Sequence, residues 1–356
     1  MRAGIFDPYL DTIGGGERYA MTVAETLLKK GWSVDVFWKN EEVKSKLMEK
    51  FSLEVERINF ISYSPVENNL FTRRKIENSY DLLFYFSDGS VPFMFGKKNL
   101  LHFQVPFKNV LKRSLKNNIK LRNIFAVVCN SNFTKKFIDE GLGISSKVIF
   151  PPVDVAVLGP MTKRNVVLSV GRFSQLLQGK RQDVLVDVFK EMVKEKKIRD
   201  WKLVLAGGSE VGSKEYLRQL RESSNKYPIE IIENPSFKEI KQLYGEAKIF
   251  WTASGYGIDE NREPERVEHF GMTTVEAMAA GCAPIVMEKG GQKEIIKNGQ
   301  NGFFWQEKEE LEKLTLDLLK DPAKLQKIAK NAILRSKDFS KEIFSEKFLS
   351  LVNERS

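Results

Sequence analysis

Two separate stretches of the chain show the same alternation of short apolar runs and amphipathic segments. Residues 2–38 and 166–206 each predict a strand, a glycine-containing turn, a helix and a second strand, with the helices over 17–30 and 183–196. A strand that is followed by a crossover helix and a further strand forms a parallel pair. Each stretch therefore predicts the start of a parallel α/β sheet.

The length of 356 residues exceeds what one hydrophobic core usually organises, so two domains are expected. The alternation of strands and helices continues after both starting units, which predicts two doubly wound, Rossmann-like α/β domains. We predict an N-terminal domain over 1–158, a second domain over 159–337 and a last helix, within 338–356, that packs back on the first domain. Sheets of this kind bind ligands at the carboxyl ends of their strands.

Composition narrows the class of protein further. Cys129 and Cys282 each sit in an apolar run, as expected of buried thiols in a reducing compartment, so a cytoplasmic protein is expected. His102 and His269 have no Cys or His partner at metal-ligand spacing, and no zinc site is predicted. The chain shows neither a secretory signal pattern nor the roughly 18 apolar residues in a row that a membrane span requires.

A segment in the second half carries two carboxylates around the start of a predicted helix. Glu268 precedes the helix over 273–280, and Glu276 lies in its first turns. The free N–H groups and the positive dipole end at such a start suit a pyrophosphate. Glu276 could accept hydrogen bonds from ribose hydroxyls, with Glu268 facing a transferred sugar. Two acids at this place also stabilise a helix without any ligand, so the pair alone does not decide between the two interpretations.

The residues around the two carboxylates read EHFGMTTVEAMAAG, and they resemble the E-x7-E signature of the retaining family-four glycosyltransferases. This resemblance implies the GT-B fold, in which two Rossmann-like domains face a central cleft. It implies a catalytic role for Glu268. It also implies donor binding by the helix start and its second acid, namely Phe270, Gly271, Met272, Thr273 and Glu276.

Two cations near the start of the second domain fit the same reaction. Gly171 and Arg172 follow the predicted strand 166–170, with Lys180 a short loop later, and they resemble the family's residues that hold the donor diphosphate. Charge builds on the leaving phosphate as a glycosidic bond breaks, so fixed cations there stabilise the transition state. The chain has no Asp-x-Asp pair of the kind that holds a divalent metal. The resemblance implies no metal or other cofactor.

The first domain contributes a glycine-rich loop and a histidine. Gly15 and Gly16 belong to a GGGER sequence that resembles the family's loop beside the donor phosphates, in the form found in mannosyltransferases of lipid-linked oligosaccharide assembly. His102 ends a predicted strand and resembles the family histidine that reaches the transferred sugar. Taken alone, a triple glycine is more often a simple turn, and a histidine in an apolar run is more often a core residue.

The net charge of +10 is concentrated in one stretch. Residues 97–122 contain eight basic and no acidic side chains, interleaved with apolar ones such as Val110 and Leu111. This composition predicts either a surface for anionic lipid headgroups or a solvated helix face. If the first holds, the protein would lie peripherally on the inner face of a membrane.

The resemblance implies a retaining, metal-independent hexosyltransferase that uses a nucleotide sugar, with guanosine diphosphate mannose as the donor suggested by the GGGER resemblance. The acceptor would be a saccharide or a lipid-linked saccharide, as in polysaccharide assembly. Two alternatives remain. One is a sugar-nucleotide 2-epimerase, which shares the architecture. The other is a non-catalytic basic protein that binds nucleotides or nucleic acid, although no RNA-binding motif is visible.

Overall fold

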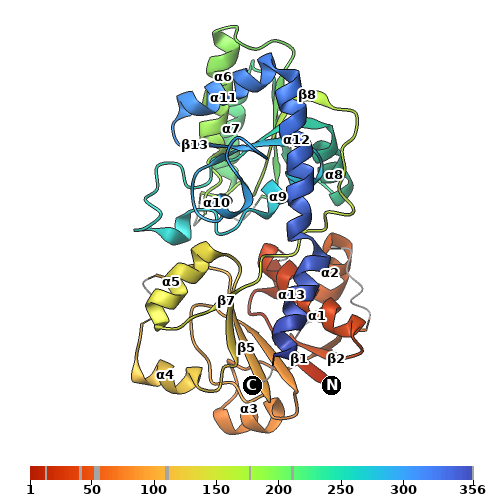
Figure 1. Cartoon of the computed structure of the whole chain (residues 1–356), viewed down its shortest axis with the longest axis vertical. Helices are drawn as coiled ribbons and strands as arrows, with labels where there is room; N and C mark the ends of the chain where they lie inside the picture. The colour runs from red at the N-terminus through yellow and green to blue at the C-terminus, as the bar shows by residue number, and fades with distance from the viewer. Residues whose placement is uncertain are drawn as a thin grey trace. The chain divides into compact units, whose positions relative to one another are not determined.

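The chain folds into two compact units, which are drawn in Figure 1. The computed structural model describes all residues except 13, 40–41, 52–56, 109–111, 176–177, 210–211 and 355–356, and it leaves the side chains of 48–51 undescribed. The first unit comprises Met1–Pro152 with Lys341–Ser356, and the second comprises Val153–Ser340. These divisions lie close to the predicted ones at 158/159 and 337/338. Both units contain parallel sheets with helices, which confirms the predicted fold class of two Rossmann-like α/β domains.

The first unit is built on a seven-stranded parallel sheet of order β3-β2-β1-β4-β5-β6-β7. The strands are β1 Arg2–Phe6, β2 Ser33–Phe37, β3 Asn59–Ile61, β4 Leu82–Phe86, β5 Lys98–Phe103, β6 Ala126–Cys129 and β7 Lys147–Val148. The helices are η1 Leu10–Thr12, α1 Gly15–Lys29, α2 Glu42–Phe51, α3 Leu70–Glu77, α4 Leu115–Leu121, α5 Asn132–Leu142 and α13 Lys341–Asn353.

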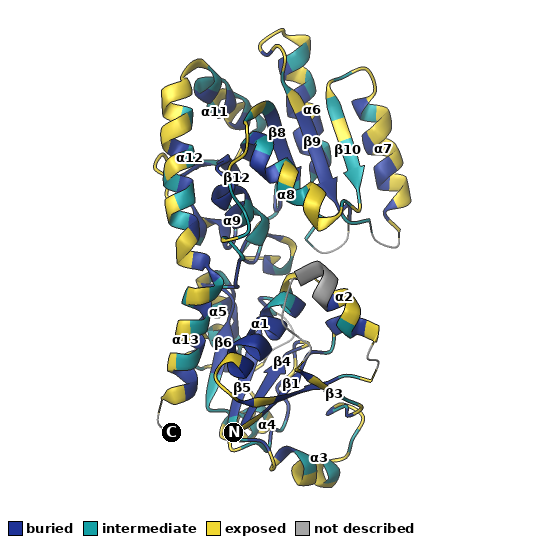
Figure 2. Ribbon diagram, turned by 90° about the vertical axis from the view of Figure 1, so that its right-hand side faces the viewer, coloured by how far each residue is buried: buried dark blue, intermediate teal, exposed yellow. Residues whose placement is uncertain are grey.

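Helices cover both faces of this sheet. Side chains of α1, α2 and α13 form one apolar cluster with the sheet, and side chains of α3, α4 and α5 pack into a second cluster on the opposite face. A strand such as β4, with the sequence LLFYF, is buried along its whole length, as its dark blue ribbon shows (Figure 2). Parallel strands buried on both faces read as continuous apolar runs, which explains why the sequence predicts them well.

Helix α13 belongs to the first unit although it follows the whole second unit in the chain. Phe344 and Phe348 lie in the same apolar cluster as the side chains of α1. The rings of Phe344 and Tyr19 pack edge to face, with their centroids 4.8 Å apart. Thr26 and Ser345 are joined by a hydroxyl hydrogen bond of 2.8 Å. The core of the first unit is thus assembled from two distant parts of the sequence.

The second unit is built on a six-stranded parallel sheet of order β10-β9-β8-β11-β12-β13. The strands are β8 Arg164–Val170, β9 Lys202–Gly207, β10 Ile229–Glu233, β11 Ala247–Trp251, β12 Ala283–Met287 and β13 Phe303–Trp305. The helices are α6 Gln182–Lys194, α7 Lys214–Ser224, α8 Phe237–Glu246, η2 Pro264–Arg266, α9 Met272–Ala279, α10 Gln292–Ile295, α11 Lys308–Lys320, α12 Pro322–Ser336 and η3 Lys337–Phe339.

The helices of the second unit also divide between two faces. Helices α6, α7 and α11 share one apolar cluster, and α8 and α9 contribute to another. The start of α8 shows how local sequence sets a boundary, because the Ser236 hydroxyl accepts a hydrogen bond from the Glu239 N–H while the Glu239 carboxylate accepts one from the Ser236 N–H. Within the described parts of both units, no helix has the length and apolar character needed to cross a membrane.

Candidate active site

The carboxyl ends of the strands in the second sheet collect the predicted site residues of that unit. Strand order reverses between β8 and β11, which makes this edge a topological switch point. Gly171 and Arg172 directly follow β8, and Thr252 directly follows β11. Open parallel sheets bind ligands in the crevice beside such a point.

Glu268 and Lys180 form an ion pair at this edge. Lys180 Nζ donates to Glu268 Oε2 at 2.7 Å, and the two side chains are only 19% and 14% exposed. Burial alone would raise the pKa of Glu268, but the charges of Lys180, His269 and Arg172 together lower it below the ordinary value. Glu268 is therefore an ionised carboxylate, and the Lys180 ammonium is the main group that stabilises it.

The loop that carries Gly171 and Arg172 is held tightly against the end of β9. A Cβ atom on Gly207 would lie 2.0 Å from the Gly171 carbonyl oxygen, so only glycine fits there. Gln182, which is buried, donates from Nε2 to the carbonyl oxygens of Gly171 at 3.3 Å and Arg172 at 3.1 Å. Its Oε1 accepts a hydrogen bond from the Tyr216 hydroxyl at 3.1 Å. These contacts fix the backbone from which the Arg172 side chain extends.

Helix α9 begins at a glycine that no other residue could replace without strain. Gly271, its N-cap, has φ of +115°, and a Cβ there would lie 2.8 Å from Nε2 of the buried Gln292. Met272 and Thr273 at the helix start are half-buried, whereas the Phe270 side chain packs edge-on against Phe339 in the interior. At Phe270, therefore, the backbone is the part that can face a ligand.

The second carboxylate and the far end of α9 are also fixed by side chains. Glu276 Oε2 accepts a hydrogen bond of 2.9 Å from the Tyr244 hydroxyl. Lys163 Nζ donates to the carbonyl oxygens of Ala247 and Ala280, each at 2.7 Å, which lie at the C-terminal ends of α8 and α9. Burial lowers the pKa of Lys163. A cation at two helix C-termini stabilises both helix dipoles and so holds α9 in place.

The long segment before Glu268 is fastened to the rest of the unit. Arg181 Nη1 donates to the Tyr256 carbonyl oxygen at 3.0 Å, and Gln178 Nε2 donates to the Val267 carbonyl oxygen at 3.2 Å. Glu260 accepts hydrogen bonds from the Gly290 N–H and from Lys293 Nζ. The Glu260 carboxylate thus has a structural role, since it joins this segment to the loop after β12.

Buried polar atoms without a hydrogen-bond partner cluster at the same edge. Among the described residues they include the hydroxyls of Thr252, Ser254 and Thr274 and both amide atoms of Gln292. Native proteins leave few such atoms, and those that occur often mark a functional site. This part of the unit is therefore polar inside as well as at its surface.

In the first unit, His102 ends β5 inside an aromatic cluster. Its ring stacks on Tyr19 with centroids 4.0 Å apart and lies 4.8 Å from the Phe86 ring, and the residue has no exposed surface. His102 Nε2 is 2.9 Å from Gln104 Oε1, and Nδ1 has no partner among the described residues. Burial lowers the pKa of His102 to about 4, so the imidazole is neutral near pH 7.

The glycine-rich loop begins α1. Gly15 is exposed and Gly16 half-buried, and a Cβ on Gly16 would lie 2.9 Å from the Phe86 ring. Glu17 accepts a hydrogen bond from the Gly14 N–H and caps the helix. At the end of β1, burial and the charge of Glu17 raise the pKa of Asp7 well above its usual range.

The structure thus brings together Arg172, Lys180 and Glu268 in the second unit, with α9 in the same unit, whereas Gly15, Gly16 and His102 lie in the first. Sequence reasoning missed Gln182 and Lys163. One signal for Gln182 existed, because it occupies a buried position of α6 with Leu185 and Phe189, at helical spacing on the apolar face. A glutamine on an apolar face needs a partner.

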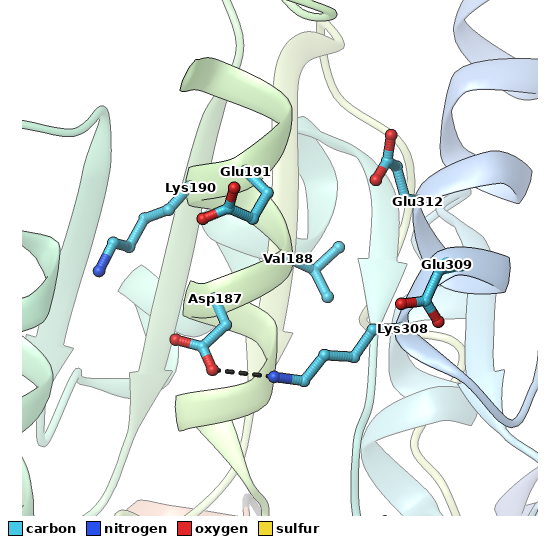
Figure 3. Close-up of a pocket in the computed structure, with 7 residues that line it drawn as sticks. All are labelled: Asp187, Val188, Lys190, Glu191, Lys308, Glu309 and Glu312. Atoms are coloured by element: carbon cyan, nitrogen blue, oxygen red, sulfur yellow. Dashed lines mark hydrogen bonds and ion pairs between the residues drawn. The ribbon is translucent and has the colours of Figure 1, made fainter. Parts of the chain in front are cut away.

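A separate cavity of about 270 Å³ lies between α6 and α11 and shares no residue with this edge (Figure 3). Most of the side chains that line it are charged. Lys308 Nζ donates a hydrogen bond of 2.9 Å to Asp187 Oδ2 across the cavity. Nowhere in the described ranges do three or more His, Cys, Asp or Glu side chains group closely enough to hold a metal ion.

Comparison with known proteins identifies the family to which these two parallel α/β units belong. Residues 153–335 match the family described as "Glycosyl transferases group 1", and the chain belongs to this family. One solved structure of similar fold is a glycosyltransferase from Rickettsia africae. It superposes on this chain with a TM-score of 0.77 at 20% sequence identity, and the match covers 99% of this chain and 97% of the other. Anabaena HepE in complex with UDP has a TM-score of 0.76 and 18% identity, with 98% and 99% covered.

Two curated relatives extend the similarity. An uncharacterized glycosyltransferase of Methanocaldococcus jannaschii is 27% identical over 243 residues, which cover 65% of this chain and 62% of the relative. A GDP-Man:Man(3)GlcNAc(2)-PP-Dol alpha-1,2-mannosyltransferase of Dictyostelium discoideum is 29% identical over 224 residues, which cover 58% of this chain and 41% of the relative. The match spans less than two thirds of the length of either relative.

Proposed function

We propose that this protein transfers a hexose from a nucleoside diphosphate sugar to a saccharide or lipid-linked saccharide. The observation that carries the proposal is the Lys180–Glu268 ion pair, with the Arg172 charge acting on the same carboxylate, at the carboxyl edge of the second sheet. Two cations at a switch point suit a diphosphate, and a carboxylate bonded to one of them suits the hydroxyls of the attached sugar.

The predicted residues of the second unit have distinct roles in this reaction. Arg172 and Lys180 stabilise the charge that develops on the leaving diphosphate, in place of a metal ion. The start of α9, from Gly271 to Thr273, offers backbone N–H groups to the same diphosphate. Glu276 accepts hydrogen bonds from the ribose, and Glu268 positions the sugar. In the first unit, the role of Gly15 and Gly16 beside the donor phosphates stays a prediction. His102 has no exposed surface, so no direct contact with the sugar is proposed for it.

The proposed stereochemistry is retention. No side chain at the edge is assigned as a covalent nucleophile, so the acceptor hydroxyl attacks from the face that the diphosphate leaves, and its proton passes to the departing phosphate oxygen. The sugar–phosphate bond breaks and the new glycosidic bond forms on the same face. Glu268 stays ionised throughout, in accord with its lowered pKa.

The proposed donor is GDP-mannose. The GGGER sequence at Gly14–Arg18 and the similarity to the Dictyostelium discoideum mannosyltransferase, whose name gives GDP-Man as the donor, support this choice. The complex of HepE with UDP makes a uridine donor the main competitor. The proposed location is cytoplasmic, on the inner face of a membrane that supplies the lipid-linked acceptor.

A panel of GDP-, UDP- and ADP-sugars, tested for thermal stabilisation and slow hydrolysis with and without a chelator, measures donor choice and metal dependence. Arg172→Gln and Glu276→Gln should each abolish the stabilisation by the preferred donor. Arg164→Gln is the matched control, because Arg164 lies at the amino end of the strand that Arg172 follows. Unchanged donor affinity in both site variants would overturn the assignment. Proton NMR of the product's anomeric centre tests retention.

A further inference from the structure

Large apolar side chains are exposed on two helices of the first unit. On α3, Leu70 is 49% and Phe71 89% exposed, and on α4, Leu115 is 79% and Ile119 47% exposed. Leu115 and Ile119 are four residues apart, so they share one side of α4. Single exposed apolar residues are ordinary, but four on two helices of one unit need a reason.

The two helices belong to one surface, because both contact the segment that contains Phe93. Arg73 of α3 donates to the Phe93 carbonyl oxygen, while Lys120 of α4 lies over the Phe93 ring at 5.4 Å and donates to the Val91 carbonyl oxygen. The charge of Arg73 also contributes to the lowered pKa of Lys120, after burial and Lys116. Both helices pack on the same face of the sheet, and Figures 1 and 2 draw them toward the same end of the unit.

The exposed charges of this surface are all positive. Residues 70–75 and 112–122 contain no acidic side chain. The exposed cations are Arg74, Lys75, Lys112, Arg113, Lys116 and Arg122, and none of them has an ion-pair partner in the described part of the chain. The acid nearest in sequence on α3, Glu77, is buried and paired with Arg73.

The structure changes the composition of the basic run predicted over 97–122. Lys97 is paired with Asp81, and Lys98 donates to carbonyl oxygens at the end of α13. Lys120 donates to the Val91 carbonyl oxygen. Lys97, Lys98 and Lys120 thus have partners within the first unit. Residues 109–111, which include Val110 and Leu111, lie outside the described residues. Helix α3, which the predicted run did not include, supplies Arg74, Lys75 and the exposed Phe71.

We propose that the exposed side chains of residues 70–75 and 112–122, the α3–α4 surface, dock on a bilayer of anionic lipids. The cations lie near the phosphate groups, and Phe71, Leu115 and Ile119 insert at the level of the headgroups and upper acyl chains. Aliphatic side chains on this surface favour lipid over nucleic acid, since leucine and isoleucine cannot stack on bases as aromatic rings do. The proposal does not rest on the transfer reaction, because docking needs no donor.

Sedimentation with vesicles tests the proposal on the whole chain without nucleotide. We expect binding to phosphatidylcholine vesicles that contain phosphatidylglycerol, little binding to phosphatidylcholine alone, and weaker binding as salt rises. A charge variant, Lys112→Gln with Lys116→Gln and Arg122→Gln, should weaken binding on the order of a hundredfold, at about fivefold per cation. An apolar variant, Phe71→Ser with Leu115→Ser and Ile119→Ser, should weaken it at low and high salt alike.

Helix α12 supplies the matched control. Lys327→Gln, Lys330→Gln and Leu334→Ser remove two exposed cations and an exposed apolar side chain from another basic helix, and binding should be unchanged. Circular dichroism checks that each variant is folded. Absence of wild-type binding to anionic vesicles would overturn the proposal, as would equal loss in the control. Binding to single-stranded RNA that the charge variant abolishes, without vesicle binding, would assign the surface to nucleic acid instead.

Discussion

Lys180 and Glu268 are 88 residues apart in the chain, and a hydrogen bond of 2.7 Å joins their side chains. Lys180 lies just before α6, and Glu268 lies before α9. The ion pair therefore ties together two loops that are both proposed to contact the donor. A contact that stabilises the fold and also positions ligand-binding groups should affect both properties when it is broken.

Replacement of Lys180 by methionine should destabilise the protein. The change leaves the mostly buried Glu268 carboxylate without its hydrogen-bonded cation, and the cost should lie between the ~1 kcal/mol of an exposed pair and the ~3–5 kcal/mol of a fully buried one. Urea unfolding measures this cost, and Lys180→Met combined with Glu268→Gln should recover part of it. Lys202→Met, which breaks the exposed pair with Glu230, is the control. Equal losses in the two lysine variants would contradict the prediction.

Stability should fall between pH 6.5 and 4 because of His102. Its pKa is lowered by burial to about 4, from an ordinary value of 6.5, so the unfolded chain binds a proton in this window while the folded protein does not. The stabilisation that comes from keeping His102 neutral is fully present above pH 6.5. As the pH falls to 4, the free energy of unfolding therefore decreases by about 3 kcal/mol. Urea midpoints across this range measure it.

Two substitutions in the same aromatic cluster separate this titration from packing. His102→Phe should remove most of the slope between pH 6.5 and 4. Phe86→Leu should lower the free energy of unfolding at every pH and leave the slope as in the wild type. A slope that survives in His102→Phe would assign the pH dependence to other groups.

Gln182→Leu should weaken donor binding without any direct contact to the donor. The change leaves the carbonyl oxygens of Gly171 and Arg172 without their buried donor, which costs about 1–3 kcal/mol of stability and loosens the Arg172 backbone. Calorimetry with the preferred nucleotide and urea unfolding check the two effects. Gln242→Leu, on the exposed side of α8, is the control. Full donor affinity in Gln182→Leu would show that the loop holds its conformation by other contacts.

Lys163→Met should destabilise the second unit and loosen α9. Its ammonium group is the shared hydrogen-bond donor of the Ala247 and Ala280 carbonyl oxygens, and each charged hydrogen bond contributes about 1.5–3 kcal/mol. Hydrogen exchange should quicken at the ends of α8 and α9. As the control, Lys238→Met removes an exposed lysine at the N-terminal end of α8 and should leave exchange at the C-terminal ends of α8 and α9 unchanged.

The strands of both sheets were predictable because their apolar runs are long and buried. The predicted strand over 166–170 lies within β8, and the predicted helix over 273–280 matches α9 to one residue at each end. By contrast, β3 and β7 have three and two residues, and the half-exposed β3 shows no apolar run. Such short strands form because the neighbouring strand offers its backbone groups, and this is not visible in a local pattern.

The candidate site likewise contains residues that the sequence could predict and residues that it could not. The family resemblance marks Arg172, Lys180 and Glu268 as one group, and the structure brings them together in the second unit. Lys163 could not be predicted, since it binds backbone carbonyl oxygens, which every residue possesses. The burial of His102 also depends on tertiary packing, because Tyr19 and Phe86 come from other elements. The sequence pattern indicates which chemistry is present, but not which side chains lock the backbone.

The placement of α13 on α1 bears on how the protein is made at the ribosome. The second unit is one continuous segment, so it can complete its fold as soon as it has emerged from the exit tunnel. Most of the first unit is translated earlier, yet the apolar cluster around Tyr19 is complete only after Phe344 and Phe348 have been translated. During synthesis its apolar surface is open to chaperones for the whole time needed to translate the intervening residues.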